Sequence, residues 1–218
     1  MNEARLVIFD LDGTLLDTIA DLAAAANAAL QANHFPVRTQ AECQRFVGNG
    51  INKLLERALP QGHQTPQDIA NMRPAFFAYY DEHLTDQTRP YPGMKELLSK
   101  LQAGGVKLAV ASNKYQSATQ RLVRHFFPEI SFAAVLGQRE DVPVKPDPAI
   151  VEEILWASGV QKQNVLYVGD SDVDMQTAHN AGVRVCAVTW GFRSREELMS
   201  YQPDFMTDTP AEIAAMVD

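Results

Sequence analysis

The chain has 218 residues, of which 46% are hydrophobic and 21% charged, and its formal net charge is −8. This length allows one large domain or a core domain with a smaller one, and the negative charge argues against nucleic acid or an acidic membrane surface as the main partner. The two cysteines, Cys43 and Cys186, lack the spacing of a zinc site, which favours a reduced, cytoplasmic setting. We expect neither a membrane span nor a signal peptide, because no apolar run is long enough and no basic-then-apolar leader opens the chain.

The first predicted element is a buried strand over residues 6–9, an apolar run that leads directly into Asp10-Leu11-Asp12-Gly13-Thr14. Two carboxylates this close repel each other, so they need a cation, a shared proton or a reaction that uses both. A solvated turn is the alternative interpretation, since Asp and Gly are ordinary turn residues.

A helical insertion follows the first strand. Pro74 should kink the last of its helices or shift the start of that helix. Because the insertion leaves the loop that carries the two aspartates, we favour a cap over the carboxyl edge of the sheet rather than a bundle packed elsewhere. The predicted organisation is a core over 1–16, a helical cap over 17–85 and the rest of the core over 86–218. The four helices expected in the cap cover 18–33, 39–47, 51–59 and 66–84.

The remainder of the chain alternates short strands with helices, which indicates a parallel sheet between helical layers. The fold class is therefore α/β, a Rossmann-like parallel sheet sandwiched by helices with an inserted α-helical cap. We expect Gly191-Phe192-Arg193 near the carboxyl edge of the sheet and assign no role to it. The expected strands cover 106–111, 133–136, 164–168, 183–188 and 204–206. The expected helices cover 93–103, 115–126, 147–158 and 172–181, with a closing helix after the last strand.

Four polar fragments stand at or just beyond the carboxyl ends of predicted strands. In a parallel sheet these ends share one edge, so residues far apart in sequence can converge there. The fragments are Asp10-Leu11-Asp12, Ser112-Asn113-Lys114, Lys145-Pro146-Asp147-Pro148 and Gly169-Asp170-Ser171-Asp172-Val173-Asp174.

The order and spacing of these fragments resemble the haloacid dehalogenase superfamily of phosphotransferases, and within it the phosphoglycolate phosphatase group with a helical cap. The resemblance implies a phosphatase that acts through an aspartyl-phosphate. Asp10 would be the nucleophile, and Asp12 the general acid and then the general base. Haloacid dehalogenases proper lack the second aspartate, so Asp12 favours phosphoryl transfer over carbon–halogen cleavage. Lys145 would stabilise the charge on nucleophile and phosphate.

The same resemblance implies a Mg²⁺ site, because hard carboxylate oxygens are the ligands that this ion prefers. Asp10 and Asp170 would supply carboxylates, and Asp12 its main-chain carbonyl. Asp174 would bind the metal directly or through water, or would orient Lys145. Asp172 is expected to be a solvated residue at a helix start.

Gly13, Ser112 and Asn113 are the predicted phosphate-binding residues of the core. Gly13 would let main-chain N–H groups approach the phosphate, and Ser112 would offer its hydroxyl beside the N–H of Asn113. Lys114 is either a further ligand or a solvated lysine. In the cap, the two glycines around Asn49 predict a loop that approaches the substrate through Gly48 and Asn49, or else a plain turn between helices. Arg45 and Lys53 flank this loop and could meet a substrate carboxylate.

Several functions remain open at this stage. We expect a small phosphorylated substrate, with 2-phosphoglycolate favoured over pyrophosphate, a sugar phosphate or a nucleotide, and a monomer or homodimer. A phosphosugar mutase would use the same aspartyl-phosphate. Hydrolysis of the phosphonoacetaldehyde type would need a Schiff-base lysine, for which Lys53 is the candidate. A non-catalytic binding module is disfavoured because it would have no use for the cluster of like charges.

Overall fold

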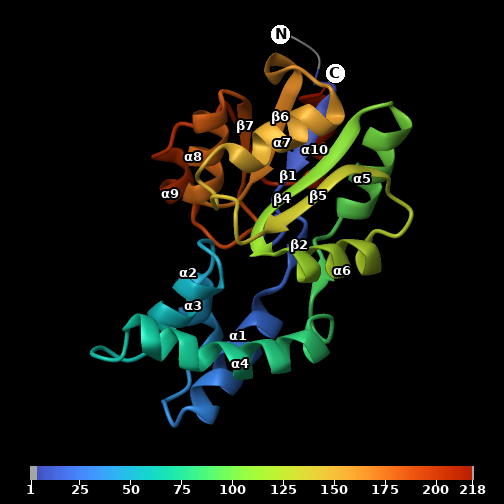
Figure 1. Cartoon of the computed structure of the whole chain (residues 1–218). Coiled ribbons are helices and arrows are strands. Elements are labelled where there is room, and N and C mark those ends of the chain that lie inside the picture. The colour runs from blue at the N-terminus through green and yellow to red at the C-terminus, as the bar shows by residue number, and fades with distance from the viewer. Residues whose placement is uncertain (1–3, 218) are drawn as a thin grey trace. The chain divides into compact units, whose positions relative to one another are not determined.

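The computed structural model describes residues 4–217, which form two compact units (Figure 1). The core unit comprises the chain up to Leu16 and from Pro90 onward, and the helical unit comprises Asp17–Arg89. Two short strands, β2 (Leu16–Asp17) and β3 (Arg89–Pro90), pair with each other where the chain passes between the units. No helix in residues 4–217 is long and apolar enough to cross a membrane.

The core unit is built on a six-stranded parallel sheet in the order β5-β4-β1-β6-β7-β8. At the centre, Phe9 lies opposite Val110 on one side and Val168 on the other. The strand order changes direction at β1, so the carboxyl ends of β1, β4 and β6 meet where open α/β sheets bind ligands. The strands are β1 (Leu6–Phe9), β4 (Lys107–Tyr115), β5 (Phe132–Gln138), β6 (Val165–Gly169), β7 (Arg184–Val188) and β8 (Phe205–Thr207).

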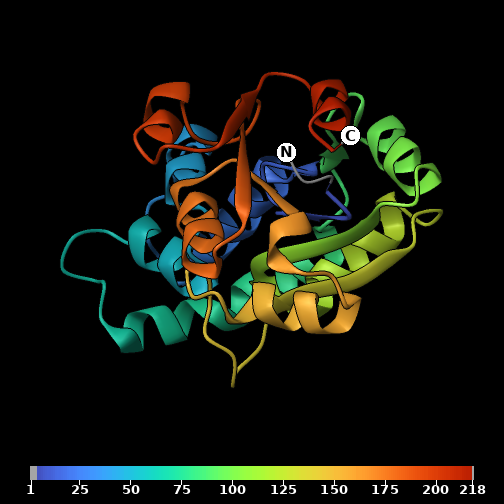
Figure 2. The same ribbon diagram turned by 90° about the horizontal axis from the view of Figure 1, so that it is seen from above.

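Helices cover both faces of this sheet, which confirms the predicted fold class (Figure 2). Successive side chains of a strand point to opposite faces. Leu6 and Ile8 therefore join the apolar cluster with α7 and α8, while Val7 and Phe9 are buried against the other layer. The helices are α5 (Met94–Ala103), α6 (Gln116–Phe126), α7 (Ala149–Ser158), α8 (Asp172–Ala181), α9 (Arg195–Met199) and α10 (Pro210–Ala215), with a 3₁₀ turn at Lys162–Asn164.

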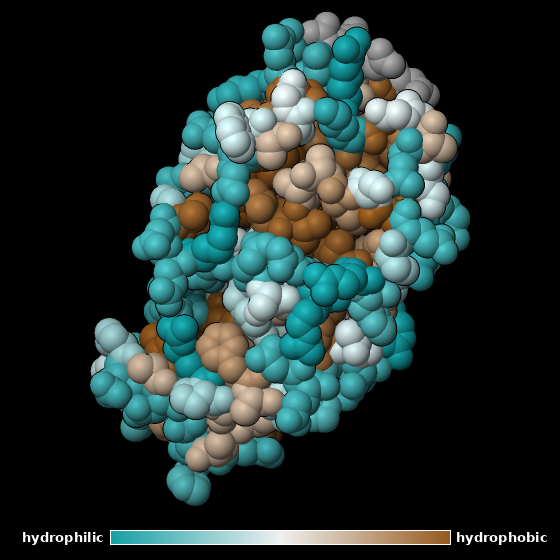
Figure 3. All heavy atoms as spheres, turned by 45° about the vertical axis from the view of Figure 1, so that its right-hand side comes forward, coloured by the Kyte–Doolittle hydropathy of each residue, from teal (hydrophilic) through white to brown (hydrophobic). Residues whose placement is uncertain are grey.

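The edge strand β5 is only partly covered. Most of its side chains are half-buried, whereas every residue of the central strand β1 is buried. On the face of the core unit drawn in Figure 3, hydrophobic residues gather in the middle and polar residues surround them.

The structure differs from the predicted elements in a few places. β4 continues to Tyr115 and so contains Ser112, Asn113 and Lys114, which were expected beyond the strand. The pairing with β5 resumes at Tyr115 after a register shift. Beside it, the Gln116 side chain accepts from the Gly137 N–H at 2.5 Å and donates to the Val135 carbonyl at 2.8 Å.

Other differences concern helix ends. α7 begins at Ala149 rather than 147, because Asp147 accepts a hydrogen bond from the Ala149 N–H across Pro148. The short helix α9 was not predicted, although Ser194 and Glu197 form a capping box that marks its start.

The helical unit contains α1 (Ile19–Ala32), α2 (Gln40–Phe46), α3 (Ile51–Ala58) and α4 (Pro66–His83). The expected shift of the last helix is wrong: α4 begins at Pro66, behind a capping box formed by Thr65 and Asp68, and continues through Pro74. Pro74 is exposed. The carbonyl that loses its partner there can therefore bond to water, so the helix is not interrupted.

A buried carboxylate ties the two ends of the helical unit together. Asp21, 2% exposed on α1, accepts hydrogen bonds from the N–H of Gln87 at 3.0 Å, and from the N–H and hydroxyl of Thr88, both at 2.8 Å. These bonds hold the returning chain against α1 just before it re-enters the core unit.

Asp21→Ala should lower the free energy of unfolding by about 2–4 kcal/mol, because it leaves buried donors without an acceptor. Urea denaturation followed by circular dichroism measures this. Glu82→Ala, at an exposed position on α4, is the matched control and should change stability by less than about 0.5 kcal/mol. Equal stability of the two variants would contradict the role of Asp21.

Candidate active site

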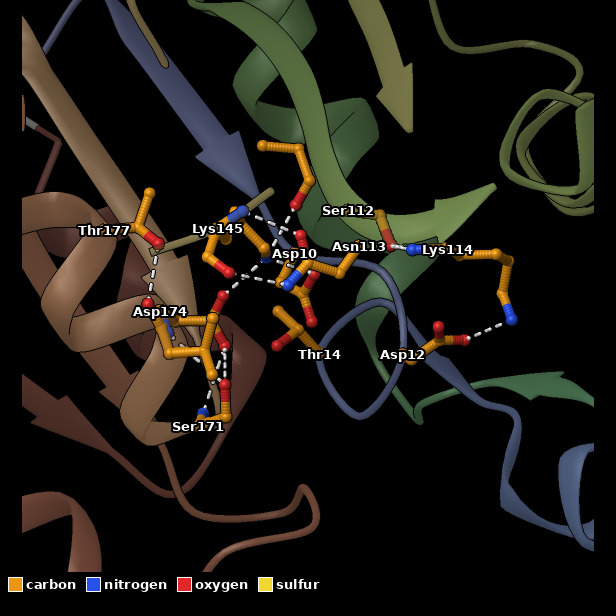
Figure 4. Close-up of polar contacts among 12 residues, drawn as sticks. Asp10, Asp12, Thr14, Ser112, Asn113, Lys114, Lys145, Ser171, Asp174 and Thr177 are labelled. Atoms are coloured by element: carbon orange, nitrogen blue, oxygen red, sulfur yellow. Dashed lines mark hydrogen bonds and ion pairs between the residues drawn. The ribbon is translucent and has the colours of Figure 1, made fainter. Parts of the chain in front are cut away.

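Asp10 is the first residue after β1, and it is 7% exposed. Its N–H donates to the Val168 carbonyl at 2.9 Å, which continues the β1–β6 ladder and fixes the side chain at the carboxyl edge. Its Oδ1 lies 2.7 Å from the Lys145 ammonium, and its Oδ2 has no hydrogen-bond partner in the described residues (Figure 4). One oxygen of this carboxylate is therefore held, and the other is open to a further ligand.

Lys145 reaches this edge from the segment between β5 and α7. The Asn113 side chain fixes its main chain, accepting from the Lys145 N–H at 2.9 Å and donating to the Lys145 carbonyl at 3.0 Å. The lysine side chain is buried, and its Nζ lies within 3.0 Å of four oxygens. These are Asp10 Oδ1 at 2.7 Å, Asp174 Oδ1 at 2.7 Å, the Ala111 carbonyl at 2.9 Å and the Tyr167 hydroxyl at 3.0 Å.

Asp170 follows β6 and is 1% exposed. Its Oδ1 accepts from the Thr14 hydroxyl at 2.9 Å, and its Oδ2 accepts from the Phe192 N–H at 2.7 Å. A β-carbon at Gly13 or Gly191 would collide with this side chain, so the two glycines make room for the carboxylate. Gly13 has a φ of +92° and its N–H donates to the Leu16 carbonyl, so this N–H already has a partner within the protein.

Asp174, in the first turn of α8, is fully buried and surrounded by donors. Lys145 and Tyr167 contact its Oδ1, while its Oδ2 accepts from the Ser171 hydroxyl at 2.6 Å and the Ser171 N–H at 3.1 Å. A carboxylate offers about four lone-pair sites, and all are used here. Asp174 thus contacts Lys145 directly at 2.7 Å, and its service as a metal ligand stays a prediction.

The cluster carries an excess of negative charge. Oxygens of Asp10, Asp170 and Asp174 lie within 4.8 Å of one another, the single such group in residues 4–217, and Lys145 offsets only one of the three charges. Burial raises the pKa of Asp10 well above its ordinary value, and repulsion from Asp174 adds to this. Burial and repulsion from Asp174 likewise raise the pKa of Asp170 from 3.8 to about 7. Two uncompensated negative charges and open carboxylate oxygens fit a divalent cation.

Lys145 and Tyr167, which both contact Asp174 Oδ1, also have raised pKa values. Burial lowers the pKa of Lys145, but attraction to Asp10 and Asp174 outweighs it and the net direction is upward, so the ammonium stays charged. Burial raises the pKa of Tyr167, so its hydroxyl keeps its proton.

Asp12 points away from this cluster. Its Oδ1 lies 3.1 Å from the Lys114 ammonium, and Figure 4 shows the two side chains meeting beside Asp10, on the side opposite Asp174. The Lys114 side chain is 3% exposed, so it is not the solvated lysine that sequence allowed. Its N–H donates to the Ser112 hydroxyl at 3.2 Å, which places Ser112 at the same edge.

The loop between α2 and α3 has the backbone that its glycines predicted, with φ of +128° at Gly48 and +81° at Gly50. Asn49 Oδ1 accepts from the Arg57 guanidinium at 2.9 Å, and Arg57 also donates to the Phe46 carbonyl at 2.8 Å. Arg45 is exposed, and Lys53 pairs with Glu56 at 2.7 Å on the surface. The cation that shapes this loop is therefore Arg57, which the sequence did not single out.

The chain belongs to the haloacid dehalogenase-like hydrolase family, whose model matches residues 7–188. It is 35% identical to a phosphoglycolate phosphatase of Mesorhizobium japonicum over 87% of this chain and 85% of that protein. It is 32% identical to one of Vibrio parahaemolyticus over 99% and 96%. A crystal structure of a predicted phosphoglycolate phosphatase from Haemophilus somnus superimposes with a TM-score of 0.92 at 32% identity and covers both chains completely. The protein is a phosphatase of this family.

The charge excess predicts how pH affects the metal-free protein. Because the pKa of Asp170 is higher in the fold than in the unfolded chain, the fold binds more protons between about pH 4 and pH 7, and stability falls as pH rises through this range. In EDTA, the free energy of unfolding of the wild type should fall over that range by about 2–4 kcal/mol more than that of Asp170→Asn. Urea unfolding at several pH values measures the difference.

Magnesium should reverse this loss, and its stabilising effect should be larger at pH 8 than at pH 5.5, where protonation competes with the metal. If the free energy of unfolding in EDTA changes with pH equally in the wild type and in Asp170→Asn, Asp170 does not carry the excess charge.

Proposed function

We propose that this phosphatase is a Mg²⁺-dependent phosphomonoester hydrolase that acts through an aspartyl-phosphate on Asp10. The observation that carries the proposal is the buried carboxylate of Asp10, with one oxygen held by Lys145 and with carboxylate oxygens of Asp170 and Asp174 close by. Asp10 and Asp170 would hold the ion through their side chains and Asp12 through its carbonyl. When bound, Mg²⁺ would offset the repulsion between the carboxylates and the phosphate.

In the proposed reaction, Asp10 Oδ2 attacks phosphorus while Lys145 keeps the carboxylate in place through Oδ1. Ser112 and the N–H of Asn113 would hold the oxygens of the transferring group. Gly13 would contribute through the turn it forms beside Asp170 rather than through its own N–H, which Leu16 occupies. Fixed positive groups around such a transfer supply much of its catalysis.

Asp12 would protonate the leaving oxygen and then take a proton from the water that hydrolyses the intermediate. In the structure its Oδ1 lies 3.1 Å from the Lys114 ammonium.

The favoured substrate is 2-phosphoglycolate, as the names of the relatives suggest. We also propose that the helical unit serves as the cap and that Gly48 and Asn49 contact the substrate, with Asn49 positioned by Arg57. A small phosphorylated metabolite in the cytoplasm suits the net charge of −8 better than a nucleic acid does.

A panel of phosphorylated metabolites assayed with Mg²⁺ tests this proposal. We expect the highest kcat/KM for 2-phosphoglycolate and little hydrolysis after EDTA treatment. A higher kcat/KM for pyrophosphate, a sugar phosphate or a nucleotide would contradict the assignment of 2-phosphoglycolate as the substrate. Phosphate release that requires a bisphosphate activator would indicate a mutase.

Asp10→Asn should lower kcat by at least about a thousandfold, because an amide does not replace the nucleophile. The fold should be retained, with equal or slightly higher stability in EDTA, since the substitution removes one of the repelling charges. Asp172→Asn, at a half-buried position of α8, is the control and should keep most of the activity. Wild-type activity in Asp10→Asn would end the nucleophile assignment.

Asn49→Ala and Arg45→Ala should change the order of substrate preference more than they change hydrolysis of an artificial aryl phosphate, which needs only the core. Because Arg57 positions Asn49, the effect of Asn49→Ala should exceed that of Arg45→Ala. The same fractional loss on every substrate would count against contact of this loop with the substrate.

A further inference from the structure

Tyr167 brings a hydroxyl into the centre of the site. It lies in β6, has no exposed surface, and its hydroxyl stands 3.0 Å from Lys145 Nζ and 3.1 Å from Asp174 Oδ1. A buried tyrosine hydroxyl usually finds a partner. Here both partners belong to the cluster, while the ring packs in the apolar layer with α7 and α8.

The directions of these two hydrogen bonds follow from the chemistry of the partners. An ammonium group only donates, so Tyr167 accepts from Lys145; an ionised carboxylate only accepts, so Tyr167 donates to Asp174. Asp174 is itself held by hydrogen bonds from Ser171. It also packs closely against Gly169, where a β-carbon would collide with it. The hydroxyl lone pair is therefore held toward Lys145.

The Lys145 ammonium has three N–H groups for four oxygen neighbours. Two of these neighbours are the carboxylates of Asp10 and Asp174, one is the Ala111 carbonyl and one is Tyr167. In the proposed reaction Asp10 is esterified, so its Oδ1 loses negative charge and becomes a weaker acceptor. The Tyr167 hydroxyl carries no charge to lose, so its hydrogen bond from the ammonium persists while the bond to Asp10 weakens, and the lysine keeps its place.

We propose that Tyr167 is a positioning residue for Lys145, which keeps the ammonium beside Asp10 while the charge of that carboxylate changes. This inference rests on the proposed function of Asp10 and Lys145. It adds a residue that no sequence motif marks, since Tyr167 reads as an ordinary member of a buried strand.

Tyr167→Phe removes the hydroxyl and retains the ring. With Mg²⁺ and the best substrate of the panel, kcat should fall tenfold or more, while KM should stay within about threefold. Tyr80→Phe, at a fully buried tyrosine of the helical unit, is the matched control and should retain kcat. A merely structural role would lower the melting temperature and leave kcat per folded molecule unchanged. Tyr167→Met serves as a second hydroxyl-free variant if the phenylalanine variant does not fold.

A second readout needs no turnover. In metal-free protein labelled with ¹⁵N, the buried Lys145 ammonium should exchange slowly enough to give a ¹H–¹⁵N signal, assigned by its loss in Lys145→Met. Tyr167→Phe should shift or broaden this signal. An unshifted signal with an unchanged kcat, beside an active wild type, overturns this inference alone. A wild type that hydrolyses no phosphate ester overturns the proposed function and the catalytic part of this inference with it.

Discussion

The buried ammonium of Lys145 is the contact on which the arrangement of the site depends. It lies 2.7 Å from both Asp10 and Asp174, and without it three buried carboxylates would face one another uncompensated. Removing one partner of a buried ion pair is more costly than never having buried it, so the fold has to hold this lysine firmly. Asn113 does so through both polar groups of the Lys145 main chain, which links β4 to the segment before α7.

The negative charge of Asp10, Asp170 and Asp174 that Lys145 does not offset affects both the stability of the fold and its proposed function. A buried cluster with two net negative charges is unfavourable by itself, and the raised pKa values of Asp10 and Asp170 express this. In the proposed function the same excess favours a divalent cation, which would then offset the charge of an incoming phosphate. Close packing preserves the cluster, because Gly13 and Gly191 leave Asp170 the space that any β-carbon would fill. The fold thus holds an unfavourable concentration of negative charge that a bound cation would relieve.

The sequence predicted most of the fold and the principal acidic residues, because both rest on local signals. Apolar runs marked the strands, and Asp10 and Asp170 directly follow two of them. What it missed depends on contacts across the chain. Tyr167 has an ordinary strand pattern. Phe192 was expected near this edge, but its role was missed because a main-chain N–H carries no side-chain signal. Lys114 looks like a solvated lysine until β4 is seen to continue past it and bring it to Asp12.

The most direct test of the account is capture of the covalent intermediate. The enzyme is mixed with Mg²⁺ and a small aryl phosphate, quenched in acid during turnover, digested and mapped by mass spectrometry. The account predicts one phosphoryl group on the peptide that contains Asp10, absent when EDTA replaces Mg²⁺. A phosphoryl group on another residue, or steady hydrolysis with Asp10 unmodified at every quench time, would contradict it.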